Sequence, residues 1–150
     1  MIRQNDTMMP EAIKNWGCYF MSVLYLAEEK RKRPFYADEI ISIYKSCLTT
    51  GIIDKEVFKD GQLIDGCYVL DPVSLFHVAG VRVSSVVKVD AKYKAMPGEY
   101  EILCYHRPAT TTNREHTHFV AGKDGKVAFD PLGSSMTVKF GYLKSKRIFK

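Results

Sequence analysis

The sequence has no hydrophobic run long enough to cross a membrane and no secretory signal. The longest apolar stretch, around Tyr19 to Ala27, falls well short of the ~20 residues that a membrane-spanning helix requires. The first residues, Met1 to Asp6, contain no apolar segment of the kind found in a signal peptide. We therefore expect a cytoplasmic protein with no membrane partner.

Closely paired cysteines are also missing. The four cysteines, Cys18, Cys47, Cys67 and Cys104, are widely scattered and form no Cys-x-x-Cys pair. This pattern argues against a disulfide framework and against a ribbon-type zinc site. It is typical of a protein kept in a reducing compartment.

Acidic residues are fewer than basic ones, 17 against 22, and the formal net charge is +5. The basic residues gather at Lys30 to Arg33 and at Lys144 to Lys150. No RNA-binding aromatic signature and no helix-turn-helix pattern accompanies them. We therefore expect a solvated helix end and a charged strand, and no nucleic-acid partner.

The totals are those of an ordinary globular domain. The 150 residues are 46% hydrophobic and 26% charged. A chain of this length buries about two thirds of its unfolded surface, so it needs no disulfide or metal in order to fold. No internal repeat or low-complexity linker divides it, and we expect one domain over residues 1–150.

The first half of the sequence is mostly helical in pattern. Apolar residues at helical spacing begin at Cys18 and give way to the charged stretch Glu28 to Arg33. A second helix is predicted from Asp38, as its cap, to about Thr49, with Gly51 as its stop. The remaining predictions for this half are a loop over residues 51–66 and a short helix from Asp71-Pro72 to Gly80.

The second half is rich in strand patterns. Strands are predicted over residues 86–89, 100–106, 117–121, 126–129, 136–140 and 142–149. Residues 108–115 form a polar loop, which we expect to border a substrate cleft together with the 51–66 loop. Helices followed by strands predict an α+β fold, in which N-terminal helices pack on a C-terminal, mostly antiparallel sheet.

Cys18 is the candidate nucleophile. It directly follows Gly17 at a helix start, where unpaired backbone N–H groups and the helix dipole favour thiolate over thiol. Gly17 has no Cβ and would let another group approach the sulfur closely. Cys47, on the apolar side of the second helix, is expected in the core, and Cys67 is expected to be half-buried.

A histidine and an aspartate begin and end a predicted hairpin, which runs from His118 to Asp130 with Asp124-Gly125 at its tip. A two-residue turn would place the two side chains on opposite faces, whereas a three-residue loop over 123–125 would place them directly opposite each other. We predict the three-residue loop. The carboxylate would then fix the imidazole tautomer and leave the other ring nitrogen to take a thiol proton. Together with Cys18, these residues supply the three parts of an activated-nucleophile site.

In chain order, these segments resemble the papain-like cysteine peptidases, and within them the bacteriocin-processing branch that cuts after double-glycine leaders. The similar segments are a Cys at a helix start in Gly17 to Ser22, a His ahead of a strand in His118 to Val120, and the strand-ending Asp130-Pro131. The resemblance implies a papain-like fold. It also implies that the three residues form a catalytic triad that hydrolyses a peptide or related amide bond, with a peptide or protein substrate and no cofactor.

One part of the family pattern is absent. The family carries a Gln shortly before the Cys, whose amide helps to bind the oxyanion, at positions held here by Ile13 and Ala12. Gln4 lies farther upstream and could serve if residues 6–14 loop out. We expect an oxyanion hole formed by the Cys18 backbone N–H and Gln4.

Two other interpretations are left open by the sequence. Cys104 with His106, and His116 with His118, each place two zinc-ligand types on one face of a strand, and a metal site would form if the two pairs converged. Alternatively, the chain keeps a papain-like fold without the chemistry and serves as a binding module.

Overall fold

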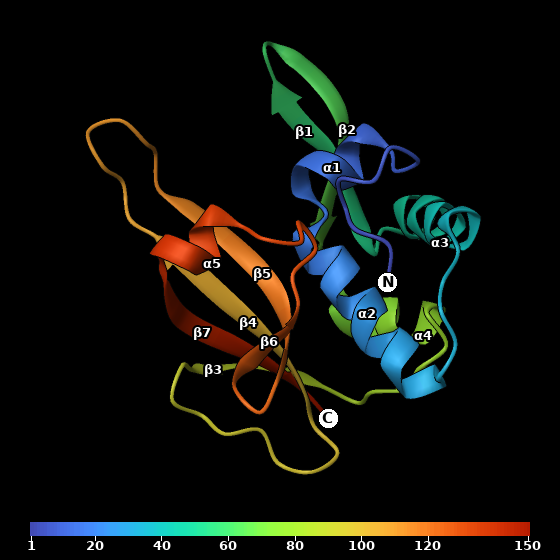
Figure 1. The fold of residues 1–150 in the computed structure, drawn as a ribbon. Coiled ribbons are helices and arrows are strands. Elements are labelled where there is room, and N and C mark those ends of the chain that lie inside the picture. Colours follow the sequence, from blue (N-terminus) through green and yellow to red (C-terminus); the bar gives the residue numbers. More distant parts are fainter.

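The helices come mainly first along the chain and the principal sheet comes last, as the sequence predicts (Figure 1). The computed structural model describes residues 1–150, apart from the side chain of Lys55. The helices are α1 (Glu11–Trp16), α2 (Cys18–Arg31), α3 (Ala37–Thr50), α4 (Pro72–Val78) and α5 (Met136–Phe140). The strands are β1 (Ile53–Lys59), β2 (Gln62–Val69), β3 (Val86–Asp90), β4 (Tyr100–Arg107), β5 (His116–Lys123), β6 (Lys126–Phe129) and β7 (Tyr142–Phe149). The fold is α+β.

The main sheet has the strand order β3-β7-β4-β5-β6, and every neighbouring pair is antiparallel. Strands β1 and β2 form a separate hairpin that projects from the body of the molecule at the top of Figure 1. Helix α2 lies beside the sheet, where it contacts β5, and α4 also packs on this helix. This arrangement brings the N-terminus of α2 to one end of β5.

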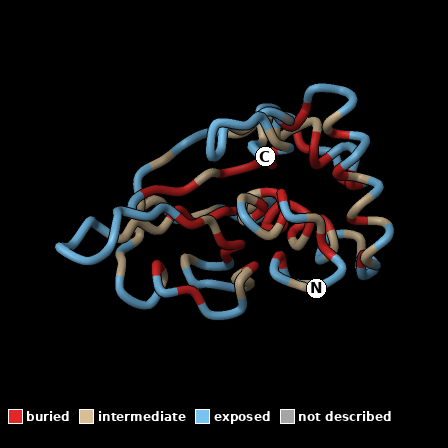
Figure 2. Tube along the Cα trace, turned by 90° about the horizontal axis from the view of Figure 1, so that it is seen from above, coloured by how far each residue is buried: buried red, intermediate tan, exposed pale blue. Residues whose placement is uncertain are grey.

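Helix α2 is the centre of the hydrophobic core. Phe20, Met21, Val23, Leu24 and Ala27 are completely buried in it. A helix that is apolar around most of its circumference must be buried on several sides, which accounts for the continuous apolar run in the sequence. Buried positions accordingly gather in the interior, and exposed ones follow the outer loops (Figure 2). Among the described residues, no helix has the length and apolar character that would carry it across a bilayer.

The predicted loop over residues 51–66 is wrong, because this segment contains β1 and much of β2. The hairpin turns at Asp60-Gly61, where both residues have positive φ, 50° and 76°. Its faces carry exposed apolar side chains, such as Phe58 at 74% exposure and Leu63 at 62%. Since much of the hairpin has no buried face, the sequence lacks the alternation that marks a half-buried strand.

The predicted strand over residues 136–140 is also wrong, because these residues form helix α5. Ser135 caps this helix, and its Oγ accepts a hydrogen bond of 3.2 Å from the Val138 N–H. The β-branched and aromatic residues of the segment favour a strand locally. The cap and the packing of α5 on β4 and β5 override that preference.

The other helix boundaries follow the sequence in part, since α1 was not predicted and α4 ends at Val78, before the predicted Gly80. Asp71 caps α4 by accepting a hydrogen bond from the Ser74 N–H, and Gly51 ends α3 with φ of 77°, both as predicted. The predicted cap of α3 is wrong, since Asp38 lies in the first turn and Tyr36 holds the cap position. The carboxylate still lies near the positive end of the helix dipole.

Candidate active site

Cys18 is the first residue of α2 and is partly exposed. Gly17 joins α1 to α2: its N–H donates to the Ile13 carbonyl at 2.8 Å, and its own carbonyl accepts from the Met21 N–H at 2.8 Å. A Cβ on Gly17 would overlap the Ile13 carbonyl oxygen. The glycine is therefore required by the sharp junction between two helices, which differs from the expected role of giving access to the sulfur.

The other three cysteines lie in the core, away from solvent. Cys47 is completely buried, as predicted, and Cys104 is 4% exposed. Cys67 is only 1% exposed, so the prediction of a half-buried thiol is wrong. Burial raises the pKa of the Cys47 thiol to about 11 and that of Cys67 further still. Neither thiol is suited to nucleophilic chemistry at neutral pH.

His118 is buried on β5, where it is hydrogen-bonded to Asp130 and shares a cavity with Cys18. Its Nε2 lies 2.7 Å from Asp130 Oδ1. Burial lowers the pKa of His118, but the hydrogen bond to Asp130 and the nearby Cys18 sulfur outweigh burial and raise the pKa to about 9. Because Nε2 is occupied by the carboxylate, Nδ1 is the ring nitrogen left for the thiol.

Asp130 is held in place by the backbone that follows it. Oδ1 accepts a second hydrogen bond from the Leu132 N–H at 3.0 Å, and Oδ2 accepts one from the Ser135 N–H at 3.0 Å. Burial raises the pKa of this carboxyl, but the hydrogen bond from His118 and those from the backbone outweigh burial, and the pKa lies below its ordinary value. The group is therefore a fixed anion beside the imidazole.

The predicted three-residue loop of the β5–β6 hairpin is wrong, although His118 and Asp130 do meet. The turn has two residues, Asp124-Gly125, both with positive φ, and it pairs Lys123 with Lys126. A bulge then shifts the register, because Gly122 pairs with residue 127 and Ala121 with residue 129. The extra residue on β6 exchanges the two faces of the strand for the residues that follow it. Asp130 therefore lies on the same face of the sheet as His118.

Gln4 reaches the site by the route that the sequence required. Its backbone N–H donates to the Pro131 carbonyl at 2.9 Å, which holds the N-terminal segment beside Asp130, while residues 6–16 form turns and α1. The buried Nε2 donates to the carbonyls of Ile13 at 3.2 Å and Lys14 at 2.9 Å. Both amide hydrogens are therefore used within the protein, and Oε1 is buried without a hydrogen-bond partner.

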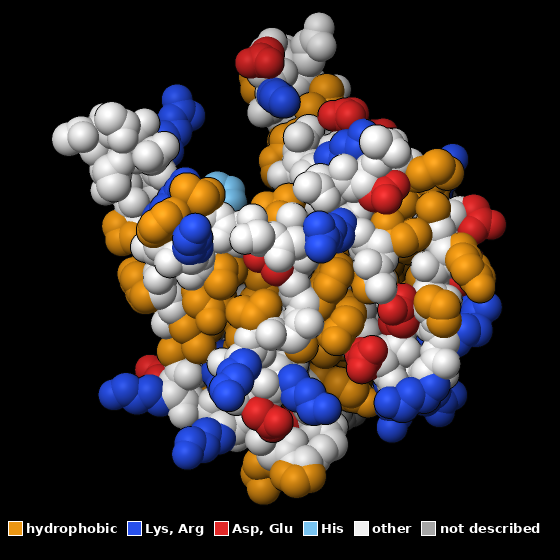
Figure 3. Space-filling model, viewed as in Figure 1, with side chains coloured by type: hydrophobic (Ala, Val, Ile, Leu, Met, Phe, Trp, Pro, Cys, Tyr) orange, Lys and Arg blue, Asp and Glu red, His pale blue; other side chains and the backbone are white. Residues whose placement is uncertain are grey.

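A cavity of about 480 Å³ lies over Cys18, His118 and Gln4. Its walls include Val57, which lies in the 51–66 segment expected to border a cleft. No residue of the other expected segment, 108–115, lines it, and Thr117 at the start of β5 takes that place. Figure 3 shows a hollow between the projecting hairpin and the loop that precedes β5, with a histidine side chain visible at its side.

His116 belongs to this cavity and has no role in the predicted site. It lies two residues before His118, so both side chains are on the same face of β5. Its Nδ1 lies 2.9 Å from Thr137 Oγ1 of α5, and burial lowers its pKa. The two-residue spacing in the sequence indicates that His116 and His118 share a face. The contact with Thr137 could not be predicted, because the residues of α5 were predicted as a strand.

The two pairs of candidate zinc ligands do not converge. Tyr105 pairs with His118 and Arg107 with His116, so these histidines lie on the opposite face of the sheet from Cys104 and His106. Within the described part of the chain, no group of three or more His, Cys, Asp or Glu side chains could hold a metal ion.

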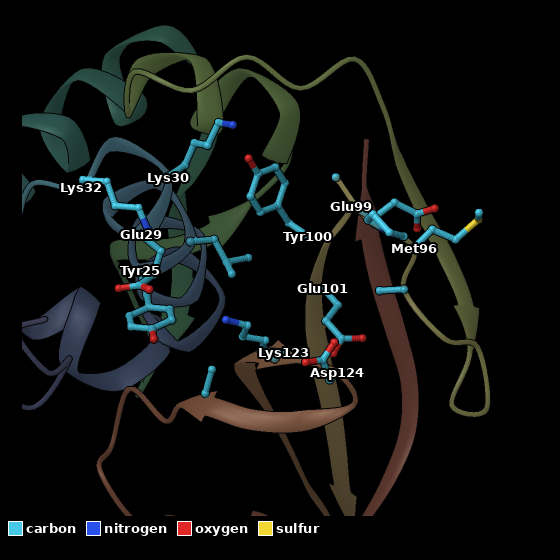
Figure 4. Close-up of a pocket in the computed structure, with 16 residues that line it drawn as sticks. Tyr25, Glu29, Lys30, Lys32, Met96, Glu99, Tyr100, Glu101, Lys123 and Asp124 are labelled. Carbon is cyan, nitrogen blue, oxygen red and sulfur yellow. The ribbon is translucent and has the colours of Figure 1, made fainter.

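A larger cavity, of about 580 Å³, lies elsewhere, between the C-terminal part of α2 and the segment before β4 (Figure 4). Its labelled side chains include Glu29, Lys30, Glu99 and Lys123, which carry charges of both signs. None of the three candidate triad residues lines it. The candidate site is therefore not in the larger of these two cavities.

Comparison with known proteins gives one match. No curated protein and no solved structure is significantly similar to the chain. The family model described as "Protein of unknown function, DUF261" matches residues 1–150. Since this match covers the whole chain, the protein belongs to the DUF261 family.

Proposed function

We propose that the protein is a cysteine peptidase-like hydrolase that cuts a peptide or related amide bond, with a papain-like arrangement of its fold. The observation that carries the proposal is that Cys18 and His118 line one cavity, and that His118 is hydrogen-bonded to Asp130 at 2.7 Å. The thiol lies at a helix N-terminus, the imidazole lines the same cavity, and a fixed carboxylate holds its Nε2. These are the parts of an activated nucleophile.

In the proposed reaction, His118 already holds the thiol proton as an imidazolium, in keeping with its raised pKa, and the Cys18 thiolate Sγ attacks the carbonyl carbon of the amide. The imidazolium then gives its proton to the departing amine, and the C–N bond breaks to leave a thioester on Cys18. A water molecule, deprotonated by the same imidazole, attacks the thioester. The products are a carboxylic acid and the regenerated thiol. Asp130 stays ionised throughout and stabilises the imidazolium.

The oxyanion would be stabilised by the Cys18 backbone N–H, which is one of the first N–H groups of α2. Gln4 would add a donor only if its amide left the carbonyls of Ile13 and Lys14. Loss of one oxyanion donor costs on the order of a hundredfold to a thousandfold in rate. We therefore expect a slow hydrolase unless substrate binding reorients Gln4.

The engaged amide of Gln4 is also the observation that favours a second candidate function. A chain with the triad geometry but without a second oxyanion donor would bind a peptide and leave it uncut. In that case Cys18 would react with electrophiles, because thiolate formation does not require the oxyanion hole.

The first test is the rate at which iodoacetamide alkylates Cys18 near neutral pH, measured by mass spectrometry. Exposure alone makes Cys18 faster than the buried cysteines, so the informative comparison is between variants. His118→Ala should slow alkylation of Cys18 at least tenfold, whereas His106→Ala, on the other face of the sheet, should leave it unchanged. Equal rates in the two variants would refute the activated thiol.

The second test asks whether the thiol completes hydrolysis. A mixed peptide library is incubated with the wild type, with Cys18→Ala and with His118→Ala, and new peptide termini are detected by mass spectrometry. Cleavage by the wild type alone would support the hydrolase. A reactive Cys18 without any cleavage would support the binding module instead.

A further inference from the structure

A second cavity, of about 370 Å³, also reaches Cys18. It shares part of its lining with the cavity over His118, because Trp16, Cys67, Tyr68 and Phe119 belong to both. The two cavities therefore adjoin at Cys18, and a peptide lying across the sulfur would have room in both.

Lys88 and Arg147 line the second cavity and are direct cross-strand partners on β3 and β7. Like charges placed opposite each other in an antiparallel pair destabilise the sheet. No Asp or Glu lines the cavity, and neither cation takes part in any ion pair among the described side chains. Two cations are thus held together without an anion to balance them.

Arg147 is fixed in position although it has no carboxylate partner. Its Nη1 donates to Ser145 Oγ at 3.0 Å, and its guanidinium lies 5.6 Å from the centre of the Phe119 ring. Phe119 in turn packs edge-on against Tyr19, with ring centres 4.9 Å apart. A guanidinium held in this way loses little entropy when it binds an anion, and its remaining N–H groups suit a carboxylate.

We propose that the Lys88–Arg147 pair binds an acidic side chain of the peptide substrate, next to an apolar group held by the aromatic walls of the cavity. This inference rests on the proposed hydrolase for its link to Cys18, but the binding itself does not require catalysis. The substrate class is therefore an acidic peptide, with the carboxylate on one side of the bond that Cys18 attacks.

Binding is measured through Trp16, the only tryptophan of the chain, which lines the cavity. The Cys18→Ala protein, which cannot cut, is titrated with three pools of acetylated and amidated tetrapeptides, and tryptophan fluorescence is recorded. The pools differ in one residue, which is Glu in the first, Gln in the second and Lys in the third. Within a pool this residue is placed at each of the four positions in turn, and the other three positions hold neutral residues. Glu peptides should bind at least tenfold more tightly than Gln peptides, since charge-assisted hydrogen bonds are stronger than neutral ones. Added salt should reduce the difference.

Lys88→Glu and Arg147→Glu should abolish the preference for Glu and favour Lys peptides. Lys144→Glu makes the same change of charge at an exposed position of β7 outside the cavity and should leave the preference intact. Lys88 is exposed, so its variant keeps the fold even if Arg147→Glu does not. Equal binding of the three pools, or an equal effect of Lys144→Glu, would overturn the proposal.

The two proposals fail in different ways. If Cys18 alkylation is independent of His118 while the Glu preference and its loss in Lys88→Glu are observed, the hydrolase is wrong and the anion site stands. If alkylation depends on His118 but the Glu, Gln and Lys pools bind alike, the hydrolase stands and the acidic specificity is wrong.

Discussion

Replacing Asp130 by Asn tests the centre of the proposed site, because the carboxylate accepts hydrogen bonds from three groups. Oδ1 accepts hydrogen bonds from His118 Nε2 and from the Leu132 N–H, and Oδ2 accepts one from the Ser135 N–H. An amide has only one oxygen, so its NH₂ group must face a donor in either orientation. Asp130→Asn therefore leaves at least one N–H of this set without an acceptor.

The cost of one buried donor without an acceptor is about 1–3 kcal/mol. We expect the free energy of unfolding to fall by about this amount in Asp130→Asn near neutral pH. Asp124→Asn is the matched control, because it makes the same chemical change at the exposed tip of the same hairpin, where Asn tolerates the positive φ of 53°. This control should stay within about 0.5 kcal/mol of the wild type.

The pH dependence of stability gives a second readout. Folded His118 keeps its proton up to a pKa of about 9, whereas an unfolded histidine loses it near 6.5. Unfolding therefore releases a proton between these pH values, so the stabilisation from His118 is complete below pH 6.5 and is lost as the pH rises through 9. A shift of this size corresponds to about 3 kcal/mol. In Asp130→Asn the pKa of His118 should fall and this loss should shrink.

Urea unfolding at several pH values measures the free energies, and NMR titration of the imidazole measures the pKa of His118. Asp130→Asn should also slow alkylation of Cys18, because the imidazole loses the carboxylate that stabilises its charged form. An unchanged pKa of His118 in a fully folded Asp130→Asn protein would refute the structural reasoning, whatever happens to activity.

Two further substitutions separate the scaffold from the site. Gly17→Ala should lower the unfolding free energy by about 1–3 kcal/mol in urea titrations, because the new Cβ would overlap the Ile13 carbonyl, and an unchanged midpoint would contradict the close approach. Glu101→Gln should destabilise the fold by about 3–5 kcal/mol, because it leaves the buried Lys146 ammonium, now 3.1 Å from Glu101 Oε2, without its counter-charge. At a denaturant concentration where the variant is still folded, its Cys18 alkylation rate should equal that of the wild type.

Local signals in the sequence determined much of the fold. The apolar spacing after Cys18 predicted α2, Asp71-Pro72 predicted the start of α4, and residues 126–129 were predicted as the strand that is β6. Each of these signals acts over a few residues, through helical periodicity, capping and turn geometry. They therefore survive in the folded chain wherever tertiary packing agrees with them.

The pairing of His118 with Asp130 was predicted for the wrong geometric reason. The sequence contains the Asp124-Gly125 turn, but the register shift between Ala121 and Gly122 depends on how β5 and β6 pack within the sheet. A shift of one residue exchanges the two faces of a strand, so register cannot be read from a short segment whose two faces are both partly polar.

The rest was decided by tertiary structure alone. The sequence by itself placed the candidate groups along the chain: a cysteine at a helix start, a histidine on a strand and an aspartate at a strand end. Only the fold brought Gln4 beside Pro131 with its amide turned to backbone carbonyls, and only strand pairing put Lys88 opposite Arg147. These contacts join residues far apart in the chain, and no local propensity encodes which of the many compatible pairings has the lowest free energy.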